Sequence, residues 1–172
     1  ATGKDPALSG LVLPDDVTHH NVDTDDGGRI HVIERGQGRP LVLLHGVTLS
    51  ASIWPFQMAD LSEDFRVVAL DQRGHGLSIP GKDGFGRDGF GRDGFGEGPS
   101  MTSYEPAGSA VTRRMALDLD QVFEALDVHD AVLAGHSMGG MVALEYVTGM
   151  GRLAAGDRVS ALALVSTSAG PI

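Results

Sequence analysis

The sequence predicts an α/β fold with a mostly parallel sheet, and the alternation of two patterns along the chain predicts it. Continuous apolar runs, typical of strands buried on both faces of a sheet, alternate with segments whose apolar residues have helical spacing. The apolar runs cover residues 40–44, 65–70, 131–134 and 159–165. Strands and helices that alternate in this order form parallel sheets with right-handed connections.

The beginning of the chain predicts an antiparallel hairpin. Residues 1–16 contain glycine, proline and aspartate without periodicity and are expected to form an arm, so that the folded core covers 17–172. Residues 18–22 and 29–34 are predicted short strands, and Asp-Asp-Gly-Gly at 25–28 has the composition of a hairpin turn. The hairpin would add an antiparallel edge to the sheet.

Two segments have the spacing of amphipathic helices. Residues 50–61 are predicted to form one helix that is capped by the hydroxyl of Ser50. Its apolar face would hold Ile53, Trp54, Met58 and Leu61. Residues 110–126 form a longer predicted helix, on which Arg113 and Arg114 are expected to face solvent.

Composition restricts the classes of function. The chain has 172 residues, of which 41% are hydrophobic, and a formal net charge of -10. We therefore expect one soluble domain, and the charge disfavours nucleic acid and anionic membranes because it repels phosphate. There is no cysteine, which excludes disulfides, thiolate nucleophiles and cysteine metal sites. No apolar run approaches the roughly 20 residues that span a bilayer. The compartment is left open, with the cytoplasm favoured.

The motif with the most chemical information is Gly-His-Ser-Met-Gly at 135–139, followed by Gly140. It lies between an apolar run and a helical pattern at 141–147, which is the strand-turn-helix context of a nucleophile elbow. In such a turn the backbone of the central serine, here Ser137, is strained and its hydroxyl projects from the sheet. The alternative is a glycine-rich helix N-terminus with a capping serine.

Two further motifs follow predicted strands, namely Leu-Leu-His-Gly at 43–46 and Asp-Gln-Arg-Gly-His-Gly-Leu-Ser at 71–78. Ligands bind at the carboxyl ends of the strands in open α/β sheets, so both motifs and Ser137 are expected to meet at one rim. Within the second motif, Asp71 and Arg73 are expected to pair with each other and hold the loop. The alternative for these two residues is a catalytic role.

The three motifs, in this order, resemble those of the α/β-hydrolase superfamily and, more narrowly, of its bacterial esterase, lactonase and cofactor-free haloperoxidase branch. The resemblance implies an α/β-hydrolase fold from about residue 18 onward, truncated after the sixth strand. It implies that Ser137 attacks carboxylic esters, lactones or related small acyl compounds and forms an acyl-enzyme. Perhydrolysis at the same site remains an alternative, and no metal or organic cofactor is implied.

Attack by a serine produces an oxyanion, which needs preorganised N–H donors. The backbone N–H of Met138, the residue after the nucleophile, is one predicted donor, and the resemblance assigns the second to Val47. The residues expected to shape the site are His45, Gly46, Gly135 and Gly139. A role of His45 as the catalytic base is the alternative to loop support. His136 is expected to pack sideways, because adjacent residues on a tight turn point in different directions.

The groups that would activate Ser137 are missing. In the family an acid and then a histidine follow the nucleophile, whereas this chain has no later histidine and only Glu145 and Asp157 as later acids. We expect a second polypeptide, or a cleaved C-terminal remainder, to pack on the apolar run at 159–165 and complete both sheet and triad. The isolated chain would then be inactive. The alternatives are a sequence that stops early and a non-catalytic binding or assembly subunit.

Residues 81–98 form an insertion after the fourth predicted strand. Asp-Gly-Phe-Gly recurs there with a period of five residues, which fits neither a helix nor a strand. The high glycine content predicts a flexible loop. The alternative is that its three phenylalanines reach the pocket mouth or dock on a partner, and calcium binding is disfavoured by the period.

Overall fold

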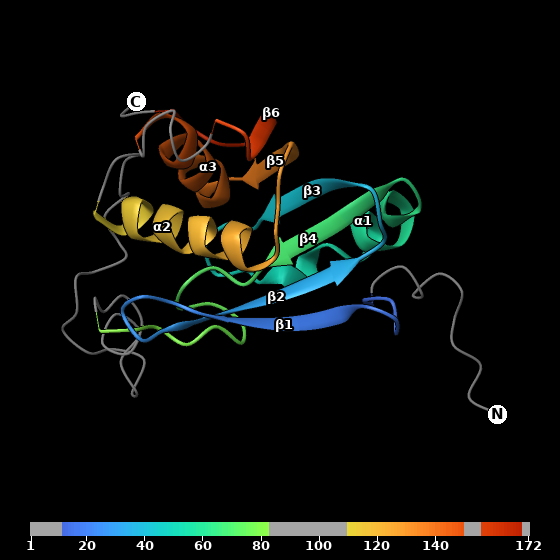
Figure 1. Ribbon diagram of the computed structural model, residues 1–172, viewed down its shortest axis with the longest axis horizontal. Helices are drawn as coiled ribbons and strands as arrows, with labels where there is room; N and C mark the ends of the chain where they lie inside the picture. The colour runs from blue at the N-terminus through green and yellow to red at the C-terminus, as the bar shows by residue number, and fades with distance from the viewer. Residues whose placement is uncertain (1–11, 83–109, 150–155, 170–172) are drawn as a thin grey trace.

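A computed structural model describes residues 12–82, 110–149 and 156–169. Within these residues the strands form one six-stranded sheet with the order β1-β2-β4-β3-β5-β6. The strands are β1 (Thr18–Asp23), β2 (Arg29–Arg35), β3 (Arg39–Leu44), β4 (Phe65–Leu70), β5 (Ala131–His136) and β6 (Val159–Val165). β2 is antiparallel to both β1 and β4, whereas the pairs β3–β4, β3–β5 and β5–β6 are parallel (Figure 1). The predicted α/β sheet with an antiparallel N-terminal hairpin is confirmed.

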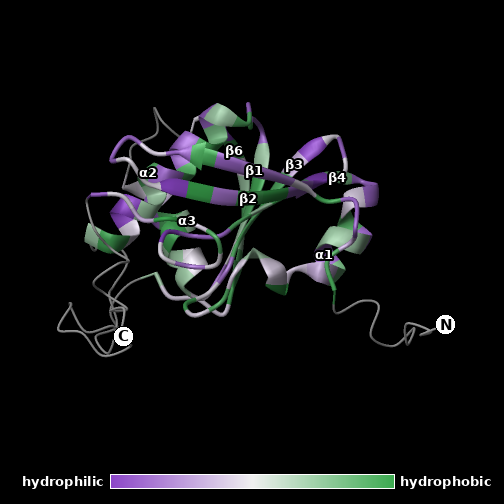
Figure 2. Ribbon diagram, turned by 90° about the horizontal axis from the view of Figure 1, so that it is seen from below, coloured by the Kyte–Doolittle hydropathy of each residue, from purple (hydrophilic) through white to green (hydrophobic). Residues whose placement is uncertain are grey.

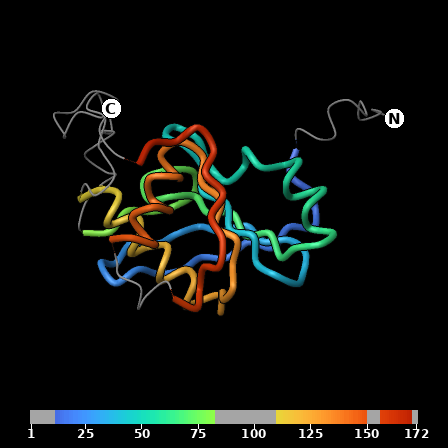
Figure 3. The backbone as a smooth tube through the Cα atoms, turned by 90° about the horizontal axis from the view of Figure 1, so that it is seen from above, coloured from blue at the N-terminus to red at the C-terminus, as the bar shows by residue number. Residues whose placement is uncertain are grey.

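The helices cover the two faces of the sheet. α2 (Ala110–Ala125) and α3 (Met138–Thr148) lie on one side, and α1 (Pro55–Asp60) lies on the other (Figure 3). Alternate residues of the central strands therefore enter different cores. In β4, Val68 packs in the cluster under α2 and α3, and Val67 packs in the cluster that contains Met58 of α1. Figure 2 shows hydrophobic colour concentrated on the strands in the middle of the molecule.

The single helix predicted over 50–61 is wrong. The structure divides this stretch into two short 3-10 helices, Ala51–Ile53 and Leu61–Glu63, on either side of α1. Pro55 is the reason, because proline has no N–H for a helical hydrogen bond and is tolerated at the first helical position. Ser50 does not cap a helix, and its hydroxyl instead lies 2.7 Å from that of Ser52.

Arg73 is the charged anchor of the fold. Its guanidinium is 1% exposed and forms two hydrogen bonds to Asp118 of α2 and two to Asp26 in the β1–β2 turn, at 2.7–3.0 Å. Burial lowers the pKa of Arg73, but the two carboxylates raise it more, so the charge is retained. Arg73 holds the pKa of Asp26 far below its ordinary value, against the opposing effect of burial.

Two charge predictions need correction. Arg73 pairs with Asp26 and Asp118, whereas Asp71 binds His31 and two backbone N–H groups. The expected Asp71–Arg73 pair does not form because both side chains have partners from distant elements. Arg114 is 11% exposed and paired with Asp118, so its predicted position in solvent is wrong.

Strand β6 is the edge of the described sheet, and it pairs with β5 alone. Its residues Leu162, Leu164 and Val165 are 38%, 44% and 53% exposed. A strongly apolar edge strand of this kind is available for pairing with further backbone.

Parts of the predicted organisation fall outside the described residues. Only 12–16 of the predicted arm and 81–82 of the predicted flexible insertion are described. In the ranges that are described, none of the helices has the length and apolar character needed to cross a membrane.

Candidate active site

Ser137 lies on the turn between β5 and α3. Its backbone has φ 53° and ψ -118°, in a region that residues with a β-carbon adopt only at a cost of about 1–3 kcal/mol. Such strain persists only where the surrounding structure enforces it. The conformation is that expected of a nucleophile elbow, and Ser137 stands at the carboxyl end of a central strand.

Glycines make this turn possible through close backbone approach. A β-carbon on Gly135 would lie 2.5 Å from the carbonyl oxygen of Gly139 and from the N–H nitrogen of Gly140. A β-carbon on Gly139 would overlap the backbone of Leu44 at the end of β3. The structure therefore places Gly135 and Gly139 where the strand, the helix and the neighbouring strand meet.

The segment after β6 clamps the elbow. The N–H of Ser137 donates to the carbonyl of Val165 at 2.9 Å. The hydroxyl of Thr167 donates to the carbonyl of Ser137 at 2.6 Å, and the same carbonyl accepts the N–H of Gly140 at 3.0 Å. Sequence reasoning missed Thr167, because nothing in its local pattern indicates that its partner is 30 residues away.

The loop after β3 lies against the elbow. A β-carbon on Gly46 would lie 3.2 Å from the Cβ of Ser137 and 3.0 Å from Nδ1 of His136. The structure thus brings His45, Gly46 and the exposed Val47 to the rim where Ser137 lies. Met138 is the first residue of α3, where the helix N-terminus favours negative charge.

His45 is completely buried, and both of its ring nitrogens are occupied. Nδ1 lies 2.7 Å from the carbonyl oxygen of Gly46, and Nε2 accepts the N–H of Gln72 at 3.0 Å. These two partners require the neutral tautomer with the proton on Nδ1. Burial lowers the pKa of His45 and favours the same neutral form. The geometry supports the loop-holding interpretation of His45 rather than a role as base.

The hydroxyl of Ser137 has no hydrogen-bond partner within the described ranges. His136 is half-buried, and its Nδ1 is likewise without a partner there. The two acids that follow Ser137 have other partners, since Glu145 lies 3.3 Å from Arg113 and Asp157 lies 3.5 Å from His129. The described site therefore contains a strained serine with the loop of Gly46 packed against it, and no base is hydrogen-bonded to the serine there.

Comparison with known proteins agrees with this geometry. A family model described as alpha/beta hydrolase fold matches residues 39–171. A non-heme chloroperoxidase of Kitasatospora aureofaciens is 34% identical over 142 residues, which are 81% of this chain and 42% of that protein.

Two solved structures are also similar to the chain. The epoxide hydrolase CorEH has a TM-score of 0.67 and 30% identity, over 91% of this chain and 44% of that one. An esterase from Exiguobacterium antarcticum has a TM-score of 0.66 and 27% identity, over 88% of this chain and 46% of that one. The chain spans less than half the length of these proteins. Because the family model covers most of the sequence, the chain belongs to the α/β-hydrolase family.

Proposed function

We propose that this chain is the nucleophile-bearing part of a serine hydrolase that acts on carboxylic esters, lactones or related small acyl compounds. The observation that supports the proposal is the strained backbone of Ser137 at the strand-to-helix turn, with the loop of Gly46 packed against it. An esterase and an N-acyl homoserine lactone degrading enzyme are among the similar structures. Perhydrolysis at the same serine is an alternative reaction of this site, since non-heme haloperoxidases are among the relatives.

In the proposed mechanism the hydroxyl of Ser137 attacks the acyl carbonyl and loses its proton to a histidine base. The oxyanion that forms accepts hydrogen bonds from the backbone N–H groups of Val47 and Met138. The alcohol then leaves with the proton that the histidine returns, and water hydrolyses the acyl-enzyme. The hydrogen bonds of Thr167, Val165 and Gly140 to the Ser137 backbone would hold the nucleophile in place during these steps.

We further propose that the acid and the histidine come from a polypeptide segment that lies outside these 172 residues. Either a second polypeptide or a cleaved C-terminal remainder would add strands beside β6. The exposed apolar side chains of Leu162, Leu164 and Val165 favour β6 as the contact strand. On this proposal the isolated chain is inactive.

A second candidate function is non-catalytic, in which the half-fold binds a ligand or assembles with a partner without turnover. The observation that favours it is the Ser137 hydroxyl, which has no hydrogen-bonded base among the described residues. A fluorophosphonate probe distinguishes the two functions, because it reacts only with an activated serine.

The experiment compares the 172-residue chain alone with the chain co-expressed with the C-terminal half of the Kitasatospora chloroperoxidase. Native mass spectrometry first establishes that the two polypeptides form a complex, and intact mass then measures labelling. We expect labelling of Ser137 in the complex and little in the chain alone.

Two variants control the labelling experiment. Ser137→Ala should abolish labelling, and Thr148→Val, which removes an exposed hydroxyl from the same helix, should leave it unchanged. A complex of the expected mass that does not react with the probe would contradict the hydrolase proposal and favour the binding function.

A further inference from the structure

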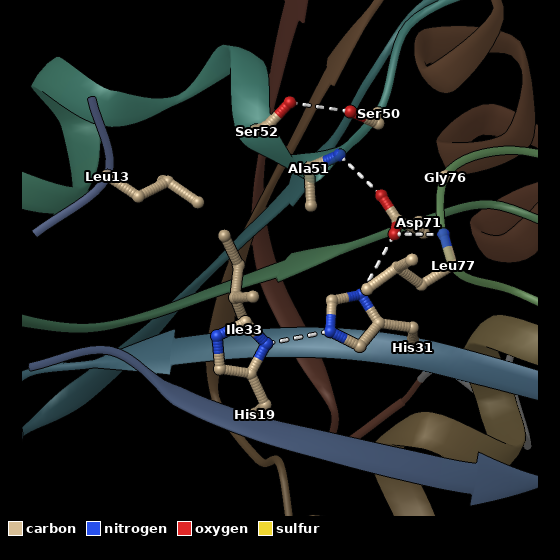
Figure 4. Close-up of a pocket in the computed structure, with 10 residues that line it drawn as sticks. All are labelled: Leu13, His19, His31, Ile33, Ser50, Ala51, Ser52, Asp71, Gly76 and Leu77. Atoms are coloured by element: carbon tan, nitrogen blue, oxygen red, sulfur yellow. Dashed lines mark hydrogen bonds and ion pairs between the residues drawn. The ribbon is translucent and has the colours of Figure 1, made fainter. Parts of the chain in front are cut away.

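A pocket with a volume of about 340 Å³ lies on the α1 face of the sheet, between the N-terminal hairpin and the loop after β4. Leu13, Ile33 and Leu77 give it apolar walls, and the imidazoles of His19 and His31 reach it from β1 and β2 (Figure 4). Apolar walls with a few convergent polar groups are typical of small-molecule sites, and the volume falls in their usual range. None of the predicted residues of the serine site lines this pocket.

The polar side of the pocket is a continuous chain of hydrogen bonds. Nδ1 of His19 lies 2.9 Å from Nε2 of His31, and Nδ1 of His31 lies 2.8 Å from Oδ2 of Asp71. The carboxylate also accepts the N–H groups of Ala51 at 2.7 Å and Leu77 at 2.8 Å. Asp71 is 3% exposed and His31 is 6% exposed, whereas His19 is exposed at the outer end of the chain.

The geometry of the hydrogen-bonded chain from His19 to Asp71 determines how many protons these side chains hold. The ionised carboxylate of Asp71 only accepts hydrogen bonds, so Nδ1 of His31 carries a proton. The two histidine nitrogens that face each other can have one proton between them. In the neutral pair His19 donates that proton and its outer Nε2 is an acceptor. With one more proton on the pair, His31 donates in both directions and the outer Nε2 of His19 becomes a donor.

Most of the other charged groups near these hydrogen bonds are paired with other residues. Arg29 of β2 pairs with Asp23 of β1, and His20 of β1 lies 3.2 Å from Glu34 of β2. Arg35 of β2 pairs with Asp16, which precedes β1. From the loop after β4, Arg73 binds Asp26 and Asp118, and Nδ1 of His75 lies 2.9 Å from the carbonyl oxygen of Arg73. Asp15, in the segment that precedes β1, is exposed to solvent. Proton gain by the histidine pair is therefore balanced locally by Asp71.

We propose that this pocket binds a small monocarboxylic acid with an apolar body, and that the His19–His31–Asp71 chain takes up one proton as the carboxylate binds. The carboxylate accepts the N–H of His19 Nε2, and the apolar body packs against Leu13, Ile33 and Leu77. The proton that makes Nε2 a donor is stabilised at the inner end of the chain by the buried carboxylate. A monoanion matches the single proton that the pair can gain, whereas a phosphate dianion would lack a second cation. The proposal is independent of the proposed hydrolase function.

The test is a calorimetric titration of the 172-residue chain with hexanoate and with hexanamide, its neutral counterpart. Titrations in buffers of different ionisation enthalpy measure proton uptake. We expect hexanoate to bind with uptake of up to one proton, and hexanamide to bind at least about 10-fold more weakly. The affinity for hexanoate should fall by up to about tenfold for each pH unit as the pH is raised, because a proton is bound with the ligand.

Matched variants assign the effect to the pocket. His19→Phe keeps a planar ring at an exposed position but removes the donor, and we expect about 10- to 100-fold weaker binding of hexanoate. His129→Phe, at another exposed histidine, should bind hexanoate as the parent chain does.

Three results would each overturn the proposal. They are no saturable binding of hexanoate by the folded chain, binding without proton uptake, and equal affinity of His19→Phe and the parent chain. Circular dichroism of each variant establishes that the fold is retained.

Discussion

At the scale of single residues, buried polar side chains connect segments that are distant in the sequence. Arg73 joins the hairpin turn to α2 through Asp26 and Asp118, and His45 joins the loop after β3 to Gln72. These groups have exchanged water for specific partners, so removing one partner leaves the others buried without compensation. Substitutions at such residues should therefore lower the free energy of unfolding strongly, even when the side chain changes little in volume.

Arg73→Met should lower the free energy of unfolding by about 3–5 kcal/mol, because it removes the cation between two buried carboxylates. Asp118 keeps its pair with Arg114, and Asp26 keeps the hydroxyl of Thr24. Urea denaturation followed by circular dichroism measures the change. Arg29→Met removes an arginine from the exposed pair with Asp23 and should have little effect. Equal losses for the two variants would contradict the assignment of Arg73 as the anchor.

His45 should make stability depend on pH in a defined direction. Its pKa in the folded chain is lowered from 6.5 by burial, so protonation favours the unfolded chain. The stability from neutral His45 is present above pH 6.5 and is lost as the pH falls toward the folded pKa. The slope in this window is at most about 1.4 kcal/mol per pH unit.

Urea denaturation at a series of pH values tests this prediction. His45→Gln should be less stable at neutral pH and should lose less stability on acidification than the parent chain. His129→Gln changes an exposed histidine and should leave the pH dependence unchanged. The contribution of the other groups is first subtracted from the measured stability. If the parent chain is then more stable below pH 6.5, the predicted direction of the His45 effect is wrong.

At the scale of elements, backbone restrictions decide where helices begin and how closely they pack. Pro55 divides the segment over 50–61 into short helical turns. The β5–α3 turn is tight because Gly135 and Gly139 allow contact between the strand, the helix and β3. Both effects arise from the geometry of single positions, although they set the path of whole elements.

Gly135→Ala should therefore cost about 3 kcal/mol, at the upper end of overpacking effects, because the added carbon meets backbone atoms that cannot rotate away. Gly27→Ala is the comparison, since a β-carbon there meets nothing within 4 Å and only the φ of 83° opposes it. We expect about 1 kcal/mol for that variant. Thermal unfolding measures both, and an equal cost would show that α3 can move away from β5.

At the scale of the whole molecule, the sheet ends at a strand whose outer surface is apolar. β6 pairs only with β5 in the described sheet, while the relatives are more than twice as long as the matched segment. We propose, from the family membership and the exposed edge, a larger assembly in which β6 is an interior strand. On that proposal the assembly supplies the base for Ser137, whose hydroxyl has no base as a partner among the described residues.

The exposed edge should make the isolated chain self-associate. Leu164→Lys places a charge on the edge strand, where Leu164 is 44% exposed, and should increase the monomer fraction. Phe56→Lys adds the same charge at a 50% exposed position on α1 and should change association much less. Sedimentation velocity measures the monomer fraction. A monomeric parent chain at high concentration would contradict the prediction.

The sequence by itself determined the elements of the fold that depend on local patterns. The apolar runs predicted β3, β4, β5 and β6, the helical spacing predicted α2, and the glycines around Ser137 predicted a tight turn. Each of these depends on hydrophobic periodicity or on the backbone freedom of glycine, which are visible in a short window. The family resemblance followed from the order of three such motifs.

Only the tertiary structure decided which side chains meet. The partners of Arg73 are 45 and 47 residues away, the clamp of Thr167 on Ser137 spans 30 residues, and His31 meets Asp71 across 40 residues. No periodic pattern encodes such pairs, because each depends on the register and order of strands that are distant in the chain. Sequence patterns therefore specified the strands and the elbow, and the packing of those strands specified the polar contacts that hold them.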